Sequence, residues 1–276
     1  MANGEGRGRR LEGRAALITG AGGGIGRGIA RALAEEGAAL ALADISPEGA
    51  EACRRGIEEM GGRAISLPLD VTKAAECETA VRKMREELGG LDILVNNAGV
   101  IGGPDFKLGL PLSDITEADL DATYEVNVKG VFLLCRVALP GMREAGWGRI
   151  VNISSRAGRE GREAIPHYSA SKAAVINFTQ ALAREAARDG VTVNAVCPGL
   201  IWSPMWERLA PLYREKIPRL AGMSAREVFD SFVNETPLRA EQTPADIGRA
   251  VAFLASEDAR TITGQALLVD SGAVMP

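Results

Sequence analysis

The sequence has few of the residues from which metal sites and disulfide frameworks are built. Its 276 residues include a single histidine, His167, and four cysteines that never occur at Cys-x-x-Cys spacing. A structural zinc ion needs about four ligands of these types, so the composition argues against a zinc site. The scattered cysteines are typical of reduced, buried side chains in a cytoplasmic protein.

Long apolar runs and a strong excess of one charge are also missing. No stretch is long enough to cross a bilayer, and the formal net charge is −4. We therefore expect neither a membrane partner nor a nucleic-acid partner. Residues 1–10 lack the apolar core of a secretory signal and are expected to form a disordered tail. Residues 11–276 are expected to form one α/β domain, for which a hydrophobic content of 46% is ample.

An apolar run at residues 15–19 leads directly into a glycine-rich turn, and helical periodicity follows as far as Glu36. A buried strand, a glycine turn and a helix N-terminus together favour phosphate binding, because glycines let the backbone approach a pyrophosphate. The alternative is a plain turn between strand and helix. The turn comprises Gly20, Gly22, Gly23, Gly24, Ile25 and Gly26.

A second apolar run, residues 39–43, ends at Asp44 and Ile45. An acidic residue at this distance after a glycine turn suits the ribose hydroxyls of NAD. Its charge would repel the 2′-phosphate of NADP, and the glycine turn contains no cation. The sequence therefore predicts NAD rather than NADP. Asp44 also precedes a helix start at Ser46-Pro47-Glu48, and flanking that helix is a compatible role.

Strands and helices continue to alternate along the chain. Near-continuous apolar strands between helices predict a doubly wound, seven-stranded parallel sheet in a single domain. Ligands of such sheets bind beyond the carboxyl ends of the strands, where the polar residues are expected to converge. Thr72 and Thr243 are expected to cap helices, and a helical region is expected from Ser113 to Ala145. The five further strands are predicted at residues 64–69, 93–95, 150–153, 191–196 and 267–269.

Tyr168 and Lys172 are four residues apart, which places them on one face of a helix. At ~4 Å and an effective dielectric of ~20, the lysine cation would attract the phenolate by about 4 kcal/mol. This attraction would lower the tyrosine pKa by up to about three units before solvent and geometry reduce it. Such a tyrosine could exchange a proton with an alcohol or a carbonyl. Taken alone, the pair is a weak signal, and an ordinary tyrosine and lysine on a helix surface are the simpler interpretation.

The order and spacing of these motifs resemble those of the short-chain dehydrogenases/reductases over nearly all of residues 11–273. The resemblance implies a Rossmann-fold oxidoreductase that transfers a hydride between NAD and a secondary alcohol or ketone. The matching motifs are the glycine turn, Asn96-Asn97-Ala98-Gly99, Asn127, Ser155, Tyr168-x-x-x-Lys172 and Pro198-Gly199.

The resemblance also implies a role for each matching residue. Tyr168 would be the general acid/base, and Lys172 would lower its pKa and bind the nicotinamide ribose. Ser155, 13 residues before the tyrosine, would hold the substrate oxygen, and Asn127, at a helix break, would support a proton relay. Further cofactor contacts are implied for Asp70, Val71, Asn97, Ala98 and Gly99 on the adenosine side, and for Pro198, Gly199, Ile201 and Ser203 at the nicotinamide.

The choice of substrate depends on less patterned parts of the chain. Residues 200–237 are implied to cover the substrate, and their apolar side chains predict a partly apolar pocket. Arg156, Arg159 and Arg162 beside Ser155 could meet an anionic substrate, although a solvated charged loop is the simpler interpretation. His167 is interpreted as structural or solvent-facing.

Two other functions fit parts of the pattern. An NADPH-dependent 3-oxoacyl-thioester reductase shares the motifs, but Asp44 argues against it. A non-catalytic dinucleotide-binding scaffold would be expected to lack part of the Asn127, Ser155, Tyr168 and Lys172 set. The resemblance further implies a homotetramer assembled through the helices that contain residues 127–145 and 169–187.

Overall fold

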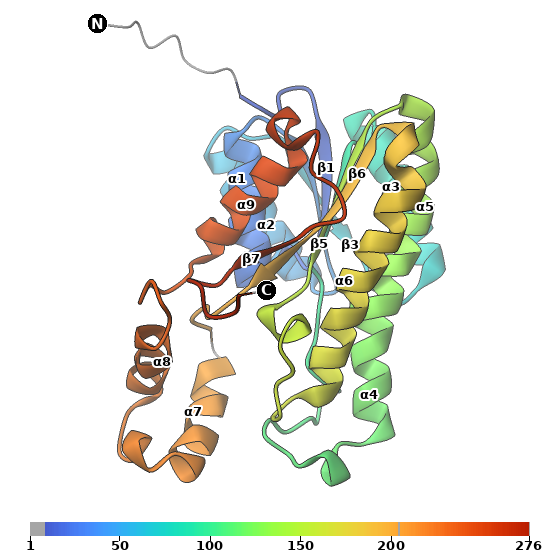
Figure 1. Ribbon diagram of the computed structural model, residues 1–276. Coiled ribbons are helices and arrows are strands. Elements are labelled where there is room, and N and C mark those ends of the chain that lie inside the picture. Colours follow the sequence, from blue (N-terminus) through green and yellow to red (C-terminus); the bar gives the residue numbers. More distant parts are fainter. Residues whose placement is uncertain (1–8, 204, 276) are drawn as a thin grey trace, which may run out of the picture.

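Seven apolar segments form one parallel sheet (Figure 1). They are β1 (Ala15–Thr19), β2 (Ala39–Asp44), β3 (Ala64–Pro68), β4 (Ile93–Asn96), β5 (Gly148–Ile153), β6 (Val191–Pro198) and β7 (Ala266–Val269). The strand order is β3-β2-β1-β4-β5-β6-β7, so the direction of winding reverses between β1 and β4. The computed structural model describes residues 9–203 and 205–275. The doubly wound, seven-stranded parallel sheet predicted from the sequence is confirmed.

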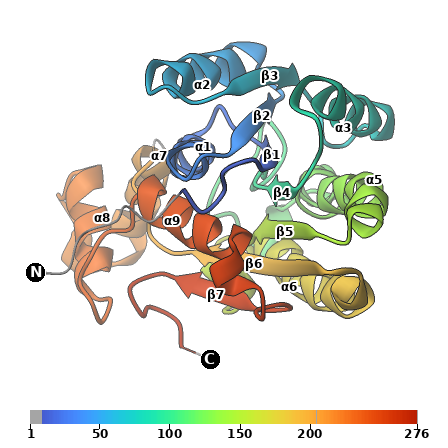
Figure 2. The ribbon, with the colours of Figure 1, turned by 90° about the horizontal axis from the view of Figure 1, so that it is seen from above.

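Helices cover both faces of the sheet (Figure 2). Because side chains alternate along each strand, Leu17 and Ala41 belong to one apolar core, whereas Ile18 and Leu42 belong to the other. Every residue of β1 is buried, as expected for a strand covered on both sides. The first core includes α3 (Ala74–Leu88), α5 (Gly130–Ala145) and α6 (Pro166–Ala186), and the second includes α1 (Gly24–Glu35), α2 (Pro47–Glu59) and α9 (Pro244–Ala255).

Three helices lie beyond the carboxyl ends of the strands. α4 (Glu117–Tyr124) joins α5 through a π-helical turn, Glu125–Lys129, which contains the interruption expected at Asn127. α7 (Met205–Lys216) and α8 (Ala225–Asn234) share a separate apolar cluster. The sequence did not reveal α7 and α8, because much of their apolar surface packs against each other and not against the sheet.

Two predicted helix starts are wrong. α3 begins at Ala74 after Lys73, and the Thr72 hydroxyl instead donates to Asp70 Oδ1 at 2.7 Å. The helical region predicted from Ser113 contains only a short 3-10 turn before α4, which begins where Thr116 forms a capping box. The predicted Thr243 cap of α9 is confirmed, again as a capping box.

The first described residues already pack against the domain. Residues 1–8 of the predicted tail lie outside the described residues, while the Arg10 guanidinium pairs with Glu36 at 2.5 Å and Leu11 is buried. Within residues 9–203 and 205–275, none of the helices combines the length and the apolar character that a membrane span requires.

Close packing of α1 against α9 yields a stability prediction. A Cβ atom at Gly248 would overlap the Gly28 carbonyl oxygen and lie 2.8 Å from Ala32 Cβ. We expect Gly248→Ala to lower the free energy of unfolding by about 3 kcal/mol and the melting temperature by about 8 °C. Gly56→Ala is the matched control, because this exposed position on α2 has open space around it. Thermal unfolding that gives equal values for the two variants would contradict the prediction.

Candidate active site

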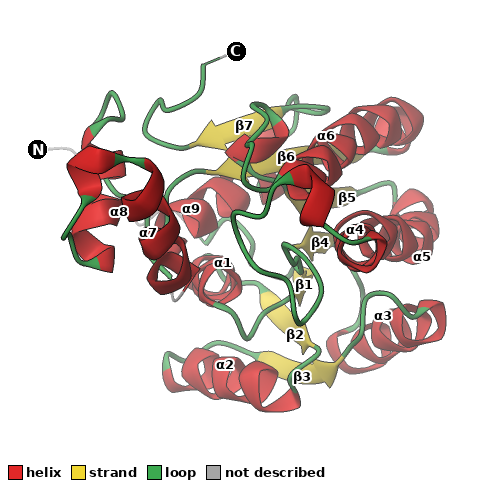
Figure 3. Cartoon of the chain, turned by 90° about the horizontal axis from the view of Figure 1, so that it is seen from below, coloured by secondary structure: helices red, strands yellow, loops and turns green. Residues whose placement is uncertain are grey.

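The carboxyl ends of the parallel strands lie on the side of the sheet that carries α4, α7 and α8 (Figure 3). The glycine turn follows β1, Asp44 ends β2, Ser155 follows β5, and Pro198 ends β6. The predicted site residues, which are far apart in sequence, are therefore brought to one edge.

The glycine turn between β1 and α1 depends on missing side chains. Gly20 adopts a positive φ of 62°. A Cβ atom at Gly26 would overlap the Gly20 carbonyl, and one at Gly22 would lie 2.9 Å from the Gly49 backbone. Asp44 completes the turn, because its Oδ2 accepts the Gly22 amide at 2.8 Å. These contacts bring the end of β2 against the turn, next to the start of α1.

The first turn of α1 has properties of an anion-binding cradle. Gly23 precedes the helix and provides no side-chain cap for its amides. The position beside Gly24 is open, since a Cβ atom there would meet nothing within 4 Å. Uncapped amides at a helix N-terminus are suitable donors to a phosphate. The residues present thus fit the pyrophosphate of a dinucleotide.

Asn97, directly after β4, ties the glycine turn to the sheet. Its Nδ2 donates to the Thr19 carbonyl at 2.9 Å and to the Gly20 carbonyl at 3.0 Å. The Ala98 amide donates to Thr19 Oγ1 at 3.0 Å. The Asn97 side chain is therefore engaged by the protein itself.

The residues predicted beside an adenine differ in what they expose. Val71 packs its side chain under Gly130 in the core, so only its backbone is available to a ligand. Asp70 accepts hydrogen bonds from the Thr72 amide and hydroxyl. Ile45 is 73% exposed and offers an apolar surface next to Asp44.

The two serines after β5 have different roles. Ser154 is buried, and its hydroxyl donates to the Lys172 carbonyl at 2.8 Å. Ser155 Oγ accepts the Ala157 amide at 3.1 Å, which leaves its hydroxyl proton free for another acceptor. Their hydrogen bonds agree with the choice of Ser155 over Ser154 from motif spacing.

The side chains of Tyr168, Lys172 and Asn127 lie close together near Ser155. The Lys172 Nζ lies 5.6 Å from the centre of the Tyr168 ring and donates to the Ile153 carbonyl at 2.9 Å. Asn127, buried at the π-helical turn, accepts the Val100 amide at 2.8 Å and donates to Ser171 Oγ at 3.0 Å. A Cβ atom at Gly99 would lie 3.2 Å from both Asn127 Oδ1 and Lys172 Nζ, so Gly99 permits this approach.

Burial reverses the expected pKa shift of Tyr168. Burial raises the pKa of the phenol to about 12, and a hydrogen bond with Ser155 acts in the opposite direction. Burial also lowers the pKa of Lys172 to about 8. The lowered tyrosine pKa expected from the lysine charge is therefore wrong for the protein without a cofactor, because the cost of desolvation outweighs that attraction.

The lowered pKa of Lys172 predicts a pH-dependent stability. Between pH 8 and 10.5 the folded protein has lost the Lys172 proton that the unfolded chain, at the ordinary pKa of 10.5, still binds. Stability from this group therefore rises with pH in that window, by up to about 3 kcal/mol, and is lost as pH falls through 8. Urea unfolding between pH 7.5 and about 9.5 should show a smaller rise in Lys172→Met than in the wild type. Equal slopes would contradict the prediction.

The segment after β6 is held by a glutamine that sequence reasoning missed. Gln242 Oε1 accepts the Leu200 amide at 2.6 Å, and its Nε2 donates to Ser271 Oγ at 2.6 Å. Ile201 forms an isolated bridge with Gln242, and a Cβ atom at Gly199 would lie 2.6 Å from Asp270. No local pattern could have identified Gln242, because its partners come from two distant segments. Pro198, Gly199 and Ile201 are thus placed beside the C-terminal turn, and the Ser203 carbonyl accepts the Trp206 amide at the start of α7.

His167 supports the loop after β4. It is buried, its Nε2 lies 2.5 Å from the Ile101 carbonyl, and its ring packs edge-on against Phe106 at 5.0 Å. Of the two interpretations of this histidine, the structural one agrees with these contacts, and the solvent-facing one is wrong because the side chain is buried.

Comparisons with known proteins agree with this fold. A family model described as Enoyl-(Acyl carrier protein) reductase matches residues 20–274. The chain is 37% identical over 262 residues to the (S)-acetoin-forming diacetyl reductase of Staphylococcus epidermidis, across 95% of this chain and 98% of the relative. It is 39% identical over 274 residues to the oxidoreductase UcpA of Salmonella typhimurium, across 97% of each chain.

A solved structure shows the same likeness in three dimensions. The NAD⁺-bound xylitol dehydrogenase is similar with a TM-score of 0.86 and 32% identity, across 95% of this chain and 100% of that one. Matches of this extent leave no large part of the chain outside the shared fold. The protein therefore belongs to the short-chain dehydrogenase/reductase family of oxidoreductases.

Proposed function

We propose that the protein is an NAD(H)-dependent oxidoreductase that interconverts a small secondary alcohol and the matching ketone. The observation that carries this proposal is the convergence of Ser155, Tyr168 and Lys172 at the sheet edge that also carries the glycine turn. Relatives named diacetyl reductase and galactitol 2-dehydrogenase support this reaction class. The NAD⁺-bound xylitol dehydrogenase supports the cofactor.

The cofactor would lie along the carboxyl edge of the sheet. The uncapped N-terminus of α1 would bind its phosphates, Asp44 would accept hydrogen bonds from the adenosine ribose, and Ile45 would cover the adenine. Asp44 would also repel the additional phosphate of NADP. At the other end, the nicotinamide would be contacted by Pro198, Gly199, Ile201 and Ser203. Residues 200–237 would cover the substrate.

In this reaction the protein accepts one proton from the alcohol, or donates it in the reverse direction. Bound NAD⁺ supplies the hydride acceptor and a positive charge that favours the tyrosine phenolate. Tyr168, as phenolate, accepts the hydroxyl proton of the alcohol, and in the reverse reaction it returns the proton to the carbonyl oxygen. The Ser155 hydroxyl donates to the substrate oxygen and stabilises its developing charge. Lys172 and Asn127, which lie near Tyr168, would support the proton relay.

A substrate panel with both cofactors tests this proposal. We expect NADH formation from at least one sugar, polyol, hydroxy acid or steroid, with NADPH formation weaker throughout. An NADPH-dependent reduction of 3-oxoacyl thioesters, with no alcohol oxidised by NAD⁺, would favour the alternative reductase. Tight NAD binding without turnover on the whole panel would favour a non-catalytic scaffold.

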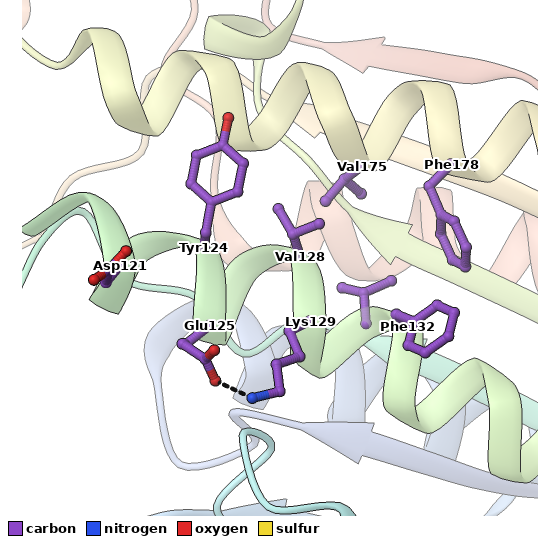
Figure 4. Close-up of a pocket in the computed structure, with 9 residues that line it drawn as sticks. Asp121, Tyr124, Glu125, Val128, Lys129, Phe132, Val175 and Phe178 are labelled. Atoms are coloured by element: carbon purple, nitrogen blue, oxygen red, sulfur yellow. Dashed lines mark hydrogen bonds and ion pairs between the residues drawn. The ribbon is translucent and has the colours of Figure 1, made fainter. Parts of the chain in front are cut away.

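We also propose a homotetramer. A groove of about 370 Å³ lies on the outer surface of α4, α5 and α6, and Phe132 at its rim is 47% exposed (Figure 4). Such an apolar face on two long helices suits contact with a second copy. Light scattering should give four times the chain mass, and Phe132→Glu should reduce that mass. A monomeric wild-type protein would refute the proposal.

We further propose that the protein acts in the cytoplasm. All four cysteines are free and buried, which fits a reducing compartment.

A further inference from the structure

The loop after β4, residues 100–111, is fastened to the elements that follow it; it is named the β4–α4 loop below. At its start, the Val100 amide donates to Asn127 Oδ1 at 2.8 Å, and the Val100 carbonyl accepts Asn127 Nδ2 at 2.9 Å. Further along, the Gly103 amide donates to Asp119 Oδ1 of α4 at 3.3 Å. These hydrogen bonds attach the loop to α4 and to the π-helical turn.

The middle of the β4–α4 loop packs beside the proposed general base. Phe106 and Leu108 are buried. The Phe106 ring lies edge-on against His167, which directly precedes Tyr168 in α6. A Cβ atom at Gly102 would overlap the Phe106 ring, so the loop backbone folds closely over this side chain. The β4–α4 loop is therefore part of the surroundings of Tyr168.

The helix α7 contacts the same loop from another direction, since α4 and α7 lie on different sides of the strand ends (Figure 3). Arg208 Nη2 of α7 donates to the Phe106 carbonyl at 3.2 Å. One turn later, Leu212 meets the loop at Gly109, where a Cβ atom would lie 2.8 Å from Leu212 Cδ1. Arg208 and Leu212 are four residues apart, so one face of α7 is directed at the β4–α4 loop.

These contacts form a continuous bridge from α6 to α7. The bridge runs from His167 through the Phe106 ring to the Phe106 carbonyl, and from there to Arg208. It connects the helix that contains Tyr168 with the segment that is expected to cover the substrate. The position of α7 over the site therefore depends on the β4–α4 loop.

We propose that Arg208 fastens α7 onto the β4–α4 loop, and that the loop and α7 together close one side of the substrate site. This inference rests on the proposed function, because it takes α7 as part of the segment that covers the substrate. A substrate whose oxygen is held by Ser155 and Tyr168 then cannot extend between α6 and α7. The substrate class is a short secondary alcohol or ketone, and a long chain on that side is excluded.

A second arginine of α7 provides a matched control. Arg214 Nη1 donates to the Met223 carbonyl at 2.8 Å, in the segment between α7 and α8. Arg208 and Arg214 thus each donate one guanidinium hydrogen bond to a backbone carbonyl, but only the bond of Arg208 reaches the β4–α4 loop. Replacing either residue by alanine removes the same chemical group from the same helix.

A homologous series from butan-2-ol to decan-2-ol, oxidised with NAD⁺, and the matching ketones, reduced with NADH, test the closure. We expect kcat/KM of the wild type to fall as the chain lengthens. Arg208→Ala should raise kcat/KM of the longest compound relative to the shortest by about 10-fold, mainly through KM, which is the effect of losing one hydrogen bond from a charged donor. Arg208→Lys should retain part of the discrimination. Arg214→Ala should retain all of it.

Hydrogen exchange of the protein without substrate tests the link between α7 and the loop independently of turnover. Peptides from α7 and from the β4–α4 loop are followed in each variant. Arg208→Ala should accelerate exchange in both segments by about 10-fold, because each loses a contact that opposes local opening. Arg214→Ala should accelerate exchange in α7 and leave the loop unchanged. If Arg208→Ala left exchange in the loop unchanged, the link would be overturned.

The two measurements separate this inference from the proposed function. Faster exchange in both segments of Arg208→Ala, with no compound oxidised or reduced, would support the link and overturn the proposed function. Equal kcat/KM values for all chain lengths in the wild type would overturn the closure and leave the proposed oxidoreductase standing. A chain-length preference that Arg208→Ala and Arg214→Ala changed equally would overturn the role of Arg208.

Discussion

Replacing Tyr168 with phenylalanine is expected to lower kcat for alcohol oxidation by about 10³-fold, within the range that general acid–base catalysis contributes. The substitution removes the phenol oxygen, which is the only group at this position that can accept the proton. The ring remains on α6, so the packing beside Lys172 is preserved. NAD binding, measured by thermal shift, should change little, because the phosphate cradle lies on α1.

A second tyrosine provides a control for this substitution. Tyr124→Phe serves as the control, because Tyr124 lines the outer groove between α4, α5 and α6 (Figure 4). It should retain wild-type kcat. If Tyr168→Phe retained more than about a tenth of wild-type kcat, Tyr168 would not be the general base.

The pH profile provides an independent check on Tyr168. Burial raises the pKa of this phenol, and below its pKa the group holds a proton and cannot act as a base. The oxidation rate should therefore rise with pH. Since the Ser155 hydrogen bond lowers the pKa, Ser155→Ala should move the rise to higher pH, in addition to reducing kcat. A profile that is flat in the alkaline range would contradict this assignment.

Replacing Asp44 with asparagine is expected to reduce the preference for NADH over NADPH by about 100-fold. Two like charges ~4 Å apart repel each other by about 4 kcal/mol at an effective dielectric of ~20, and partial exposure reduces this value. Asparagine keeps the shape and one acceptor oxygen, so the contact with the Gly22 amide can be retained. Dissociation constants of both cofactors for wild type and variant provide the ratio.

Glu48 offers a matched control for this charge change. It is an exposed carboxylate in the first turn of α2, four residues from Asp44, and its side chain accepts a hydrogen bond from Ser46 Oγ at 3.2 Å. Glu48→Gln should leave the cofactor preference unchanged. If Asp44→Asn and Glu48→Gln altered it equally, the effect would come from net charge and not from a ribose contact.

Several features could be predicted from the sequence because their causes are local. The glycine turn, the strands and the Thr243 cap depend on residues adjacent in the chain, and the pairing of Tyr168 with Lys172 follows from helix geometry alone. The order of polar residues after strand ends likewise predicts their convergence, since parallel strands present their carboxyl ends at one edge.

The pKa values of the site residues could not be predicted in this way, because they depend on distant parts of the chain. Sequence spacing brings Lys172 near Tyr168, but burial by segments far away determines that the tyrosine pKa rises. Arg156 and Arg159 belong to the same charged loop, yet burial lowers the pKa of Arg156, whereas Arg159 is exposed and donates to the Ala266 carbonyl. The fold and the chemical groups at the site follow from patterns in the sequence. The protonation states of these groups depend on tertiary structure, because desolvation depends on everything that packs around a group.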